Sequence, residues 1–445
     1  MNPSNILEKT LRRAKRLIPK SLFRAAQPFY HYALAILGAL RYGFPSKKLM
    51  VIGVTGTKGK STTVELVNSI LEAAGYKTAV AGTIRFKIGD DSRRNMYKMT
   101  MPGRFFLQSF LARAVKAGCT HAVIEMTSEG SKQYRYRFVY PDALIFTNLS
   151  PEHIESHGSY EKYVEAKLDI ARRVLRSGKP RRILVANGDD KETPKFLGLG
   201  IPESLTYFLS ATPHVSSESG STFTFMGTEM RTPLPGEFNL ANALGAATLA
   251  QALGIDTAAI ALGIKNLAHV PGRAETVTLA EDHELAREQD FTVVVDYAHT
   301  PDSLKAIYGA YGAHRKICVL GSTGGGRDTW KRGAMGAIAD EYCDEIILTD
   351  EDPYDEDPQK IVADVAEGIK SKKPDMLMDR REAIHAALSR ARKGDAVLIT
   401  GKGTDPYIMG KNGAKQPWSD ANIAREELEK VLKSRASQQK SEPQE

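Results

Sequence analysis

A glycine-rich segment near the start of the chain constrains its fold more than any other stretch. Residues 53–63 read GVTGTKGKSTT and follow the apolar run 48–52. Apolar residues then recur at helical spacing from Val64 to Leu71. The glycines are therefore predicted to lie at a strand-to-helix turn, where backbone N–H groups and the helix dipole favour a polyphosphate. A glycine-rich turn without a ligand would share this local pattern, and Val54 stands where the usual phosphate-binding loop begins with glycine.

Strands and helices alternate beyond this segment. Apolar strands are predicted at 121–125, 143–147 and 182–186, with a helix over 105–117. A continuous series of this kind is typical of a doubly wound parallel sheet, in which ligands collect at the carboxyl ends of the strands. Glu125 falls at such an end.

The alternation restarts after Gly272, which indicates a second domain. Its predicted strands are 291–295, 316–320, 345–349 and 395–399. The predicted fold is thus α/β, with a P-loop central domain over 49–271 and a Rossmann-like C-terminal α/β domain over 272–435. Residues 436–445 are polar and lack apolar spacing, so a disordered tail is predicted there.

The net charge of +8 resides in residues 1–48, which contain ten Lys or Arg and a single acid, Glu8. The rest of the chain is close to neutral, so a nucleic-acid partner is not expected. The basic segment includes an apolar stretch, 29–40, that is shorter than the roughly 20 residues of a membrane-spanning helix. Two interpretations stay open: peripheral contact with an anionic membrane, or a helical hairpin packed on the body with solvated basic faces.

The three cysteines, Cys119, Cys318 and Cys343, show no metal-ligand spacing. They are expected to be buried thiols in a reducing, cytoplasmic compartment.

Several motifs in order resemble the Mur ligases, from about residue 49 to residue 435. They are Gly56–Thr62, Thr147–His153 followed by 161–167, and Asp296–Pro301. The similarity is strongest to the branch that adds the third residue of the cell-wall stem peptide, and the family's shorter loop accounts for Val54. The resemblance implies an ATP-dependent amide ligase that activates a muramoyl-peptide carboxylate as an acyl phosphate, which a free amino acid then attacks. A folylpolyglutamate-type or other poly-amino-acid ligase and a non-catalytic nucleotide-binding module remain alternatives.

The resemblance also implies an ATP site with two magnesium ions. The expected ATP-loop residues are Gly56, Thr57, Lys58, Gly59, Lys60, Ser61 and Thr62. The expected catalytic residues are Lys60, Glu125, His153 and Lys167, and the metal ligands are Ser61, Glu125, His153 and Lys167. Lys167 matches a position that is carbamylated in many family members, although the pattern alone would make it a solvated lysine on a helix over 160–176. His153 alone would more often be a hydrogen-bonded loop histidine than a ligand.

Further contacts follow from the same resemblance. The expected nucleotide contacts are Asn242, Arg273, Asp296 and Tyr297, whose alternative roles are a helix cap, a surface cation and a strand-end turn. The expected substrate contacts are Thr100, Ser128, Gln133, Arg135, Asp352, Tyr354 and Asp405. Tyr354 replaces the arginine of diaminopimelate-adding members and Asp352 replaces an asparagine, so lysine is a more fitting donor, unless residues 350–354 form a solvated acidic loop.

Family members normally have a separate N-terminal domain for the UDP group, and the 48 residues before the central domain are too few for one. The acceptor is therefore expected to be UDP-linked and held by the other two domains, or lipid-linked and met by the basic segment. The chain is expected to act as a monomer in the cytoplasm, and peripheral membrane contact through residues 1–48 is one of the two open interpretations of that segment.

Overall fold

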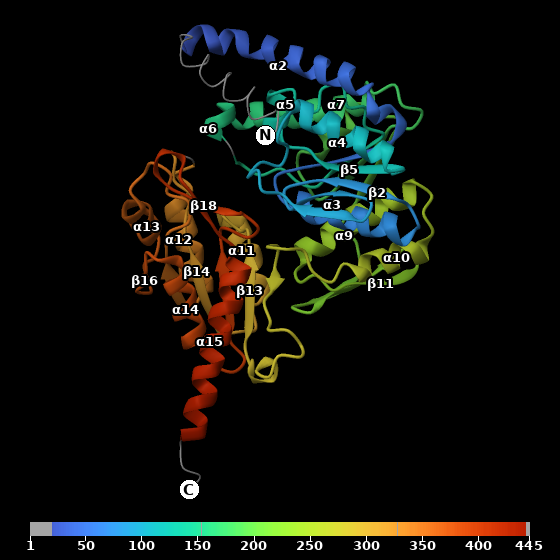
Figure 1. The fold of residues 1–445 in the computed structure, drawn as a ribbon. Coiled ribbons are helices and arrows are strands. Elements are labelled where there is room, and N and C mark those ends of the chain that lie inside the picture. Colours follow the sequence, from blue (N-terminus) through green and yellow to red (C-terminus); the bar gives the residue numbers. More distant parts are fainter. Residues whose placement is uncertain (1–19, 153, 327, 442–445) are drawn as a thin grey trace.

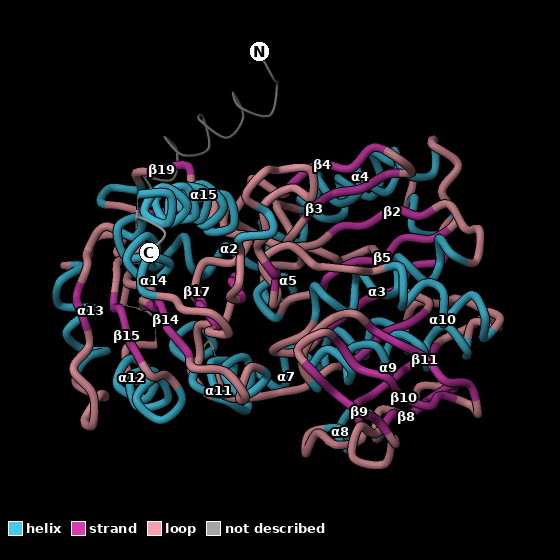
Figure 2. Tube along the Cα trace, turned by 90° about the horizontal axis from the view of Figure 1, so that it is seen from below, coloured by secondary structure: helices cyan, strands magenta, loops and turns pink. Residues whose placement is uncertain are grey.

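The computed structural model describes residues 20–152, 154–326 and 328–441. Two domains lie side by side, with helix α2 (Lys20–Tyr42) across the outside of the first (Figures 1 and 2). The predicted α/β class is confirmed, because each domain is built on a largely parallel sheet with helices on both faces.

The middle domain is an eight-stranded sheet in the order β4-β3-β2-β5-β1-β6-β7-β8. Its strands are β1 (Met50–Thr55), β2 (Thr78–Ala81), β3 (Arg85–Ile88), β4 (Asp91–Arg94), β5 (His121–Glu125), β6 (Ala143–Phe146), β7 (Ile183–Asn187) and β8 (Glu203–Tyr207). The six neighbouring strands β2, β5, β1, β6, β7 and β8 pair in parallel. At one edge, β3 and β4 add an antiparallel hairpin that the sequence did not predict.

Alternate residues of each central strand face opposite layers of helices. Val51 of β1 packs in one core with α4 and α7, and Ile52 packs in another with α3, α9 and α10. The helices are η1 (Pro45–Lys48), α3 (Lys60–Ala73), α4 (Arg104–Lys116), α5 (Ser128–Lys132), α6 (Ile154–His157), α7 (Tyr160–Leu175), α8 (Thr193–Leu197), α9 (Glu237–Ala252) and α10 (Thr257–Asn266). A small antiparallel sheet of β9 (His214–Ser217), β10 (Gly220–Phe225) and β11 (Thr228–Thr232) completes the domain.

The C-terminal domain has a six-stranded sheet in the order β12-β13-β17-β14-β15-β16, parallel except for β12. Its strands are β12 (Glu275–Thr276), β13 (Thr292–Asp296), β14 (Lys316–Leu320), β15 (Glu345–Leu348), β16 (Asp375–Met376) and β17 (Ala396–Thr400), with a separate hairpin of β18 (Tyr407–Met409) and β19 (Lys415–Pro417). Its helices are η2 (Ala286–Glu288), α11 (Pro301–Ala310), α12 (Lys331–Tyr342), α13 (Pro358–Ala366), α14 (Arg380–Arg390), η3 (Lys411–Gly413) and α15 (Asp420–Ser441).

The prediction of a disordered tail from residue 436 is wrong as far as Ser441, because α15 continues to that residue and projects from the domain (Figure 1). The helix is supported beyond its apolar residues by polar contacts. Ser437 Oγ donates to the Lys433 carbonyl oxygen at 2.9 Å, and Arg435 Nη2 donates to the carbonyl oxygen of Ala391 at 2.5 Å. Such contacts leave no apolar pattern in the sequence.

Residues 20–42 of the basic segment form one helix, whereas the other half of the helical hairpin considered from the sequence lies outside the described residues. Ala35 and Ala39 of α2 are buried, and the helix packs on α4, so that a side chain in place of Gly38 would meet the backbone of Phe105. Small residues on this face allow the two helices to approach closely.

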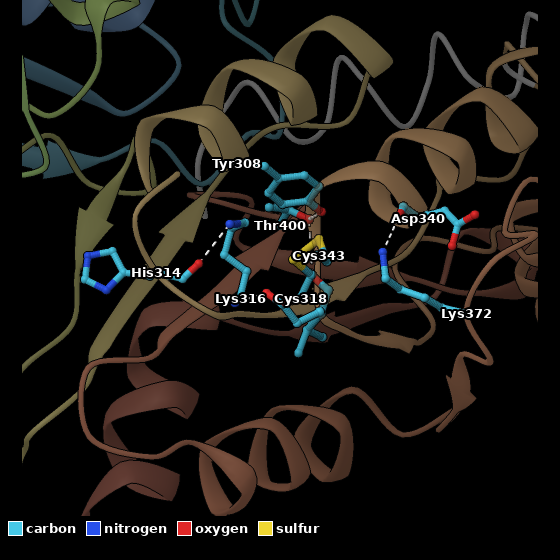
Figure 3. The surroundings of a disulfide bond; sticks show 10 residues. Tyr308, His314, Lys316, Cys318, Asp340, Cys343, Lys372 and Thr400 are labelled. Carbon is cyan, nitrogen blue, oxygen red and sulfur yellow. Dashed lines mark hydrogen bonds between the residues drawn. A yellow bond between two sulfur atoms is a disulfide. The ribbon is translucent and has the colours of Figure 1, made fainter.

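Cys318 and Cys343 form a disulfide between β14 and the residue that follows α12, beside Tyr308 (Figure 3). All three cysteines are buried, as predicted, but the expectation of free thiols holds only for Cys119. The two partners are 25 residues apart in sequence, and the fold brings their Cα atoms within 6.1 Å. The sequence did not indicate this pairing.

Between the domains the chain passes once, at residues 267–274. Gly272 has φ +60°, and a Cβ atom there would lie 2.4 Å from the amide nitrogen of Thr404. The connection between the domains is thus in van der Waals contact with the loop that follows β17.

Candidate active site

The glycine-rich loop connects β1 to α3, as predicted. Gly56 has φ +150°, and a Cβ atom there would lie 1.9 Å from Thr147 Oγ1. Gly59 has φ +79°, and a Cβ atom there would lie 2.2 Å from Asn242 Oδ1. Only glycine fits these two positions, because both the backbone conformation and the surrounding atoms exclude a side chain.

The loop is fastened to the end of β6. The backbone N–H of Thr57 donates to the Asn148 carbonyl oxygen at 2.8 Å, and that of Lys58 donates to Asn148 Oδ1 at 2.9 Å. The loop thereby stands at the carboxyl edge of the sheet with the N-terminus of α3 directly behind it, which is the geometry expected of an anion site.

Lys60, Ser61 and Glu125 meet at this edge. Ser61 Oγ donates to Glu125 Oε2 at 3.1 Å, and the same oxygen accepts the backbone N–H of Thr83 at 2.9 Å. Lys60 Nζ donates to the Thr57 carbonyl oxygen at 2.6 Å. Burial lowers the pKa of Lys60, and the charge of Glu125 opposes that shift. An acid at the end of an apolar strand is therefore compensated by a hydroxyl, a backbone amide and a nearby cation.

Lys167 is not the solvated lysine that its helix position alone would suggest. Its residue is 1% exposed on α7, and Nζ donates to the Gly56 carbonyl oxygen at 2.7 Å. Burial, followed by repulsion from Lys60, lowers the pKa of Lys167 well below its ordinary value. Lys167 thus contacts the loop from within the protein and is not among the described residues that line the cavity.

His153 lies outside the described residues, so only three of the four expected catalytic side chains have a described position. Its neighbour Glu152 is buried and faces the C-terminal domain, where Glu152 Oε1 lies 3.1 Å from His299 Nε2.

A cavity of about 890 Å³ opens over the loop and is bounded by both domains. Its volume is in the range of pockets that hold small-molecule ligands. On the loop side the lining includes Thr57, Lys58, Gly59, Lys60, Ser61, Thr62 and Glu125. The expected nucleotide contacts Asn242, Arg273, Asp296 and Tyr297 also line it, as do the expected substrate contacts Thr100, Ser128, Gln133, Arg135 and Asp405.

On the nucleotide side, Arg273 and Tyr297 form one unit, with the guanidinium carbon 4.4 Å from the ring centroid. The Asp296 carboxylate accepts the backbone N–H groups of Ala274 at 2.7 Å and Ala298 at 2.6 Å. Burial raises the pKa of Asp296, and the charge of Arg273 opposes the shift. The negative charge of Asp405 and burial together raise the pKa of Tyr297.

On the opposite side of the cavity, Arg135 is held in place by its neighbours. Its guanidinium donates to Gln133 Oε1 at 2.9 Å and to the Met101 carbonyl oxygen at 2.6 Å. Thr100 Oγ1 lies 2.8 Å from Thr83 Oγ1, and Ser128 Oγ lies within hydrogen-bonding distance of a histidine on α6. A planar cation fixed in this way suits an acidic substrate group.

Asp352 and Tyr354 differ from the other expected substrate contacts. Neither belongs to the described lining of the cavity. Asp352 is 2% exposed, and its Oδ1 accepts from Lys402 Nζ and from the backbone N–H of Met409, both at 2.8 Å. Lys98 Nζ donates to Oδ2 of the same carboxylate. Asp352 is therefore neutralised by lysines of the chain itself, and the run 350–354 is not a solvated acidic loop.

Several residues that line the cavity were not predicted from the sequence. Lys98, from the middle domain, pairs with Asp352 and lies 3.3 Å from Asp405 Oδ2. No motif marked Lys98, because its partners come from the other domain. Glu152 and His299 lie within the motifs that resemble the Mur ligases, and this position in the motifs could have identified them as site residues.

The residues present fit a magnesium ion that is also bound by nucleotide phosphates. Within the described chain, no group of three or more His, Cys, Asp or Glu side chains is placed to hold a metal. Ser61 and Glu125 nevertheless supply a hydroxyl and a carboxylate at one point, and Mg²⁺ commonly takes one or two protein oxygens together with phosphates and water.

Comparison with known families covers most of the chain. Residues 54–250 match the Mur ligase middle domain, and residues 249–403 match the Mur ligase glutamate ligase domain. The UDP-N-acetylmuramoyl-L-alanyl-D-glutamate–2,6-diaminopimelate ligase of Bacillus cereus is 34% identical over 412 residues, covering 89% of this chain and 81% of that protein. The UDP-N-acetylmuramyl-tripeptide synthetase of Roseiflexus sp. is 34% identical over 430 residues, covering 90% and 82%.

Solved structures agree with this assignment. A UDP-N-acetylmuramoyl-L-alanyl-D-glutamate–2,6-diaminopimelate ligase has a TM-score of 0.59 at 29% identity, covering 87% of this chain and 79% of that one. The folylpolyglutamate synthase of Mycobacterium tuberculosis has a TM-score of 0.66 at 16% identity, covering 84% and 93%, and this second likeness concerns the fold alone. From the loop geometry, the shared cavity and these matches, the chain belongs to the Mur ligase family.

Proposed function

We propose that this Mur ligase joins an amino acid to the carboxylate of a muramoyl-peptide in peptidoglycan precursor synthesis. Its relatives are named for this reaction, and as a family member the chain is an ATP-dependent, ADP-forming amide ligase. The observation that carries the proposal is that three groups line the same cavity. They are the phosphate loop, the pair Arg273 and Tyr297, and Arg135.

Within that cavity the residues have separate tasks. Lys60 and the N-terminus of α3 bind the outer phosphates of ATP, and Ser61 with Glu125 would hold a magnesium ion. The metal supplies charge neutralisation during phosphoryl transfer. Arg273 and Tyr297 hold the nucleotide from the second domain, while Arg135 orients an acidic group of the acceptor. Because both domains enclose the cavity, water is kept from the activated acyl phosphate.

A carbamylated Lys167 and a second magnesium ion belong to the same proposal. Carbon dioxide adds only to a neutral amine, and burial lowers the pKa of Lys167 so that this form is accessible. The resulting carbamate would carry a negative charge next to Lys60, which removes the repulsion between the two amines. Lys167 would then serve with His153 in holding the second ion.

Of the two acids expected to contact the donor amino acid, Asp405 lines the cavity, whereas Asp352 is buried against Lys98 and Lys402. The arginine expected of diaminopimelate-adding enzymes is replaced by Tyr354. At the same time, Asp352 offers no free carboxylate to a lysine side chain. The donor therefore has to be identified with a panel that includes neutral, cationic and dicarboxylic amino acids.

The decisive experiment measures phosphate release from ATP with UDP-muramoyl-L-alanyl-D-glutamate as acceptor and each amino acid in turn. Mass analysis should then find one new amide bond in the product. The Lys60→Ala variant should lose turnover because the outer phosphates lose their cation. Phosphate release with every donor at the level of the acceptor-free control would refute the proposal.

A folylpolyglutamate-type activity is the second candidate, because this chain spans 93% of the Mycobacterium tuberculosis synthase and shares its two-domain fold. A parallel reaction with a reduced folate and glutamate distinguishes the two. Turnover there, and none with the muramoyl-dipeptide, would transfer the assignment to the folate class.

A further inference from the structure

The outward face of α2 carries apolar side chains that are exposed to solvent. Phe29, Leu37 and Leu40 are 81%, 54% and 60% exposed. With Ala33 they recur at spacings of four, four and three residues, which places them on one face of the helix. Figure 1 shows α2 as the outermost element on this side of the molecule, with its opposite face toward α4.

The same region is strongly basic. Arg41 lies in the last turn of α2, and Lys47 and Lys48 are exposed in the following turn, η1. The sequence of α2 and η1 contains no acid, and the 19 residues that precede α2 contain five Lys or Arg against Glu8. An apolar helix face flanked by cations is the pattern of helices that lie in the interface of an anionic membrane.

We propose that this surface, Phe29, Ala33, Leu37 and Leu40 with Arg41, Lys47 and Lys48, docks the enzyme on an anionic lipid surface. No helix in the described residues is long and apolar enough to cross a bilayer, so the contact would be peripheral. A second copy of the chain fits this face poorly, because two such surfaces would bring their cations together. An anionic lipid surface supplies both the apolar layer and the opposite charge.

The docking helix is also connected to the cavity. The Tyr32 ring lies 6.2 Å from the ring of Tyr134 and 5.5 Å from that of Phe138. Tyr134 stands between the cavity residues Gln133 and Arg135. Docking would therefore hold the acceptor side of the cavity near the lipid, where a membrane-carried acceptor is presented. This last step rests on the proposed function, whereas the docking itself does not.

The experiment is sedimentation of the full chain with vesicles of phosphatidylglycerol and phosphatidylcholine, compared with vesicles of phosphatidylcholine alone. The apolar variant combines Phe29→Gln, Leu37→Gln and Leu40→Gln, which keep the helix propensity. The matched control combines Val215→Gln, Met226→Gln and Leu262→Gln, which remove apolar side chains of similar exposure, 76%, 60% and 49%, from the other side of the domain. A third variant combines Arg41→Gln, Lys47→Gln and Lys48→Gln.

The wild-type chain and the control should bind the anionic vesicles, and binding should weaken as salt rises. The apolar variant should bind at least roughly tenfold more weakly. Each removed cation should weaken binding by about fivefold. Equal losses in the apolar variant and the control, or wild-type binding no stronger to anionic than to neutral vesicles, would overturn the proposal.

Two further readouts keep the outcomes separate. Sedimentation equilibrium without lipid tests for dimers, and a dimer that the apolar variant dissociates, without vesicle binding, would assign the face to a second copy instead. Phosphate release with the soluble UDP-linked acceptor should be the same in all these variants, which shows that they are folded. A failure of that reaction in the wild type would count against the proposed function and leave the docking result unaffected.

Discussion

Lys167 shows how much a single buried amine depends on its surroundings. From spacing alone it would face solvent, yet it lies inside the domain against the loop carbonyl of Gly56. A protonated amine with a second lysine nearby is costly to bury, and the pKa of Lys167 is therefore well below its ordinary value.

We expect Lys167→Ala to lower kcat by roughly 10- to 100-fold while ATP binding is retained. The matched control is Lys162→Ala, which removes an exposed lysine from the same helix. In ¹³C-bicarbonate, the wild type should show a carbamate carbon resonance that is lost in Lys167→Ala and kept in Lys162→Ala. Unchanged turnover in Lys167→Ala would contradict this role.

Asp350 offers a pH-dependent test of stability. Burial raises the pKa of Asp350 to about 6, whereas the pKa in the unfolded chain is near 3.8. Between these two pH values the folded protein therefore holds a proton that the unfolded chain has released. This group therefore stabilises the fold fully below pH 3.8, and the contribution is lost as pH rises through 6.

Asp350→Asn should consequently be more stable than the wild type at pH 7.5, by up to ~2 kcal/mol after allowance for solvent screening, with the difference vanishing near pH 4. Thermal unfolding across this range measures it. The exposed Asp90→Asn should give no such pH-dependent difference. A constant offset between Asp350→Asn and wild type at all pH values would rule out this origin.

At the scale of elements, the disulfide between β14 and the end of α12 adds a covalent connection to hydrogen-bonded ones. The backbone N–H of Lys316 donates to Asp344 Oδ2 at 2.7 Å, and the backbone N–H of Asp344 donates to the Lys316 carbonyl oxygen at 2.9 Å. The bridge closes a loop of 25 residues in the C-terminal domain.

We expect the double variant Cys318→Ala and Cys343→Ala to lose about 3 kcal/mol of stability. Reductant should lower the unfolding temperature of the wild type and leave that of the variant unchanged. Denatured wild-type protein should present one reactive thiol, from Cys119. Three reactive thiols without reductant would mean that the bridge does not form.

The central strands of both sheets could be predicted from the sequence because they are continuous apolar runs between helical patterns. His121–Glu125 and Lys316–Leu320 match their predicted ranges. The edge strand Asp91–Arg94 could not be predicted, because all four of its residues are exposed and polar. Its strand conformation comes from pairing with β3, which no local pattern reports.

The candidate site divides in the same way. Residues on the phosphate loop and in the family motifs could be named from the sequence, and most of them line one cavity. The buried state of Asp352 could not be foreseen, because Lys98 and Lys402 reach it from other parts of the chain. Lysines that are distant in sequence thus neutralise the charge of Asp352 in the folded protein.

At the scale of the whole molecule, the domains are joined across the cavity by polar contacts. Lys58 Nζ lies 3.5 Å from Asp302 Oδ2, and Lys98 reaches both Asp352 and Asp405. The buried contacts of Lys98 should stabilise the association of the two domains more than the exposed pair does.

Replacing Lys98 by methionine keeps most of its length and removes the charge. Lys98→Met should raise KM for the donor amino acid by roughly tenfold, because Asp405 loses a partner and the domains close less fully. The exposed Lys393→Met serves as the control. Small-angle scattering should show a larger radius of gyration for Lys98→Met alone, and identical scattering and KM would contradict the role.

The contact of Gly272 with the loop at Gly403 and Thr404 has a consequence for turnover. Gly272 belongs to the connection between the domains, and Thr404 lines the cavity next to the expected donor contact Asp405. A rotation of the domains that lets ADP leave would therefore also move Thr404. Release of ADP and opening of the cavity around Asp405 are thus expected to occur in the same domain rotation. If that rotation were prevented, ADP and the peptide product would both stay bound.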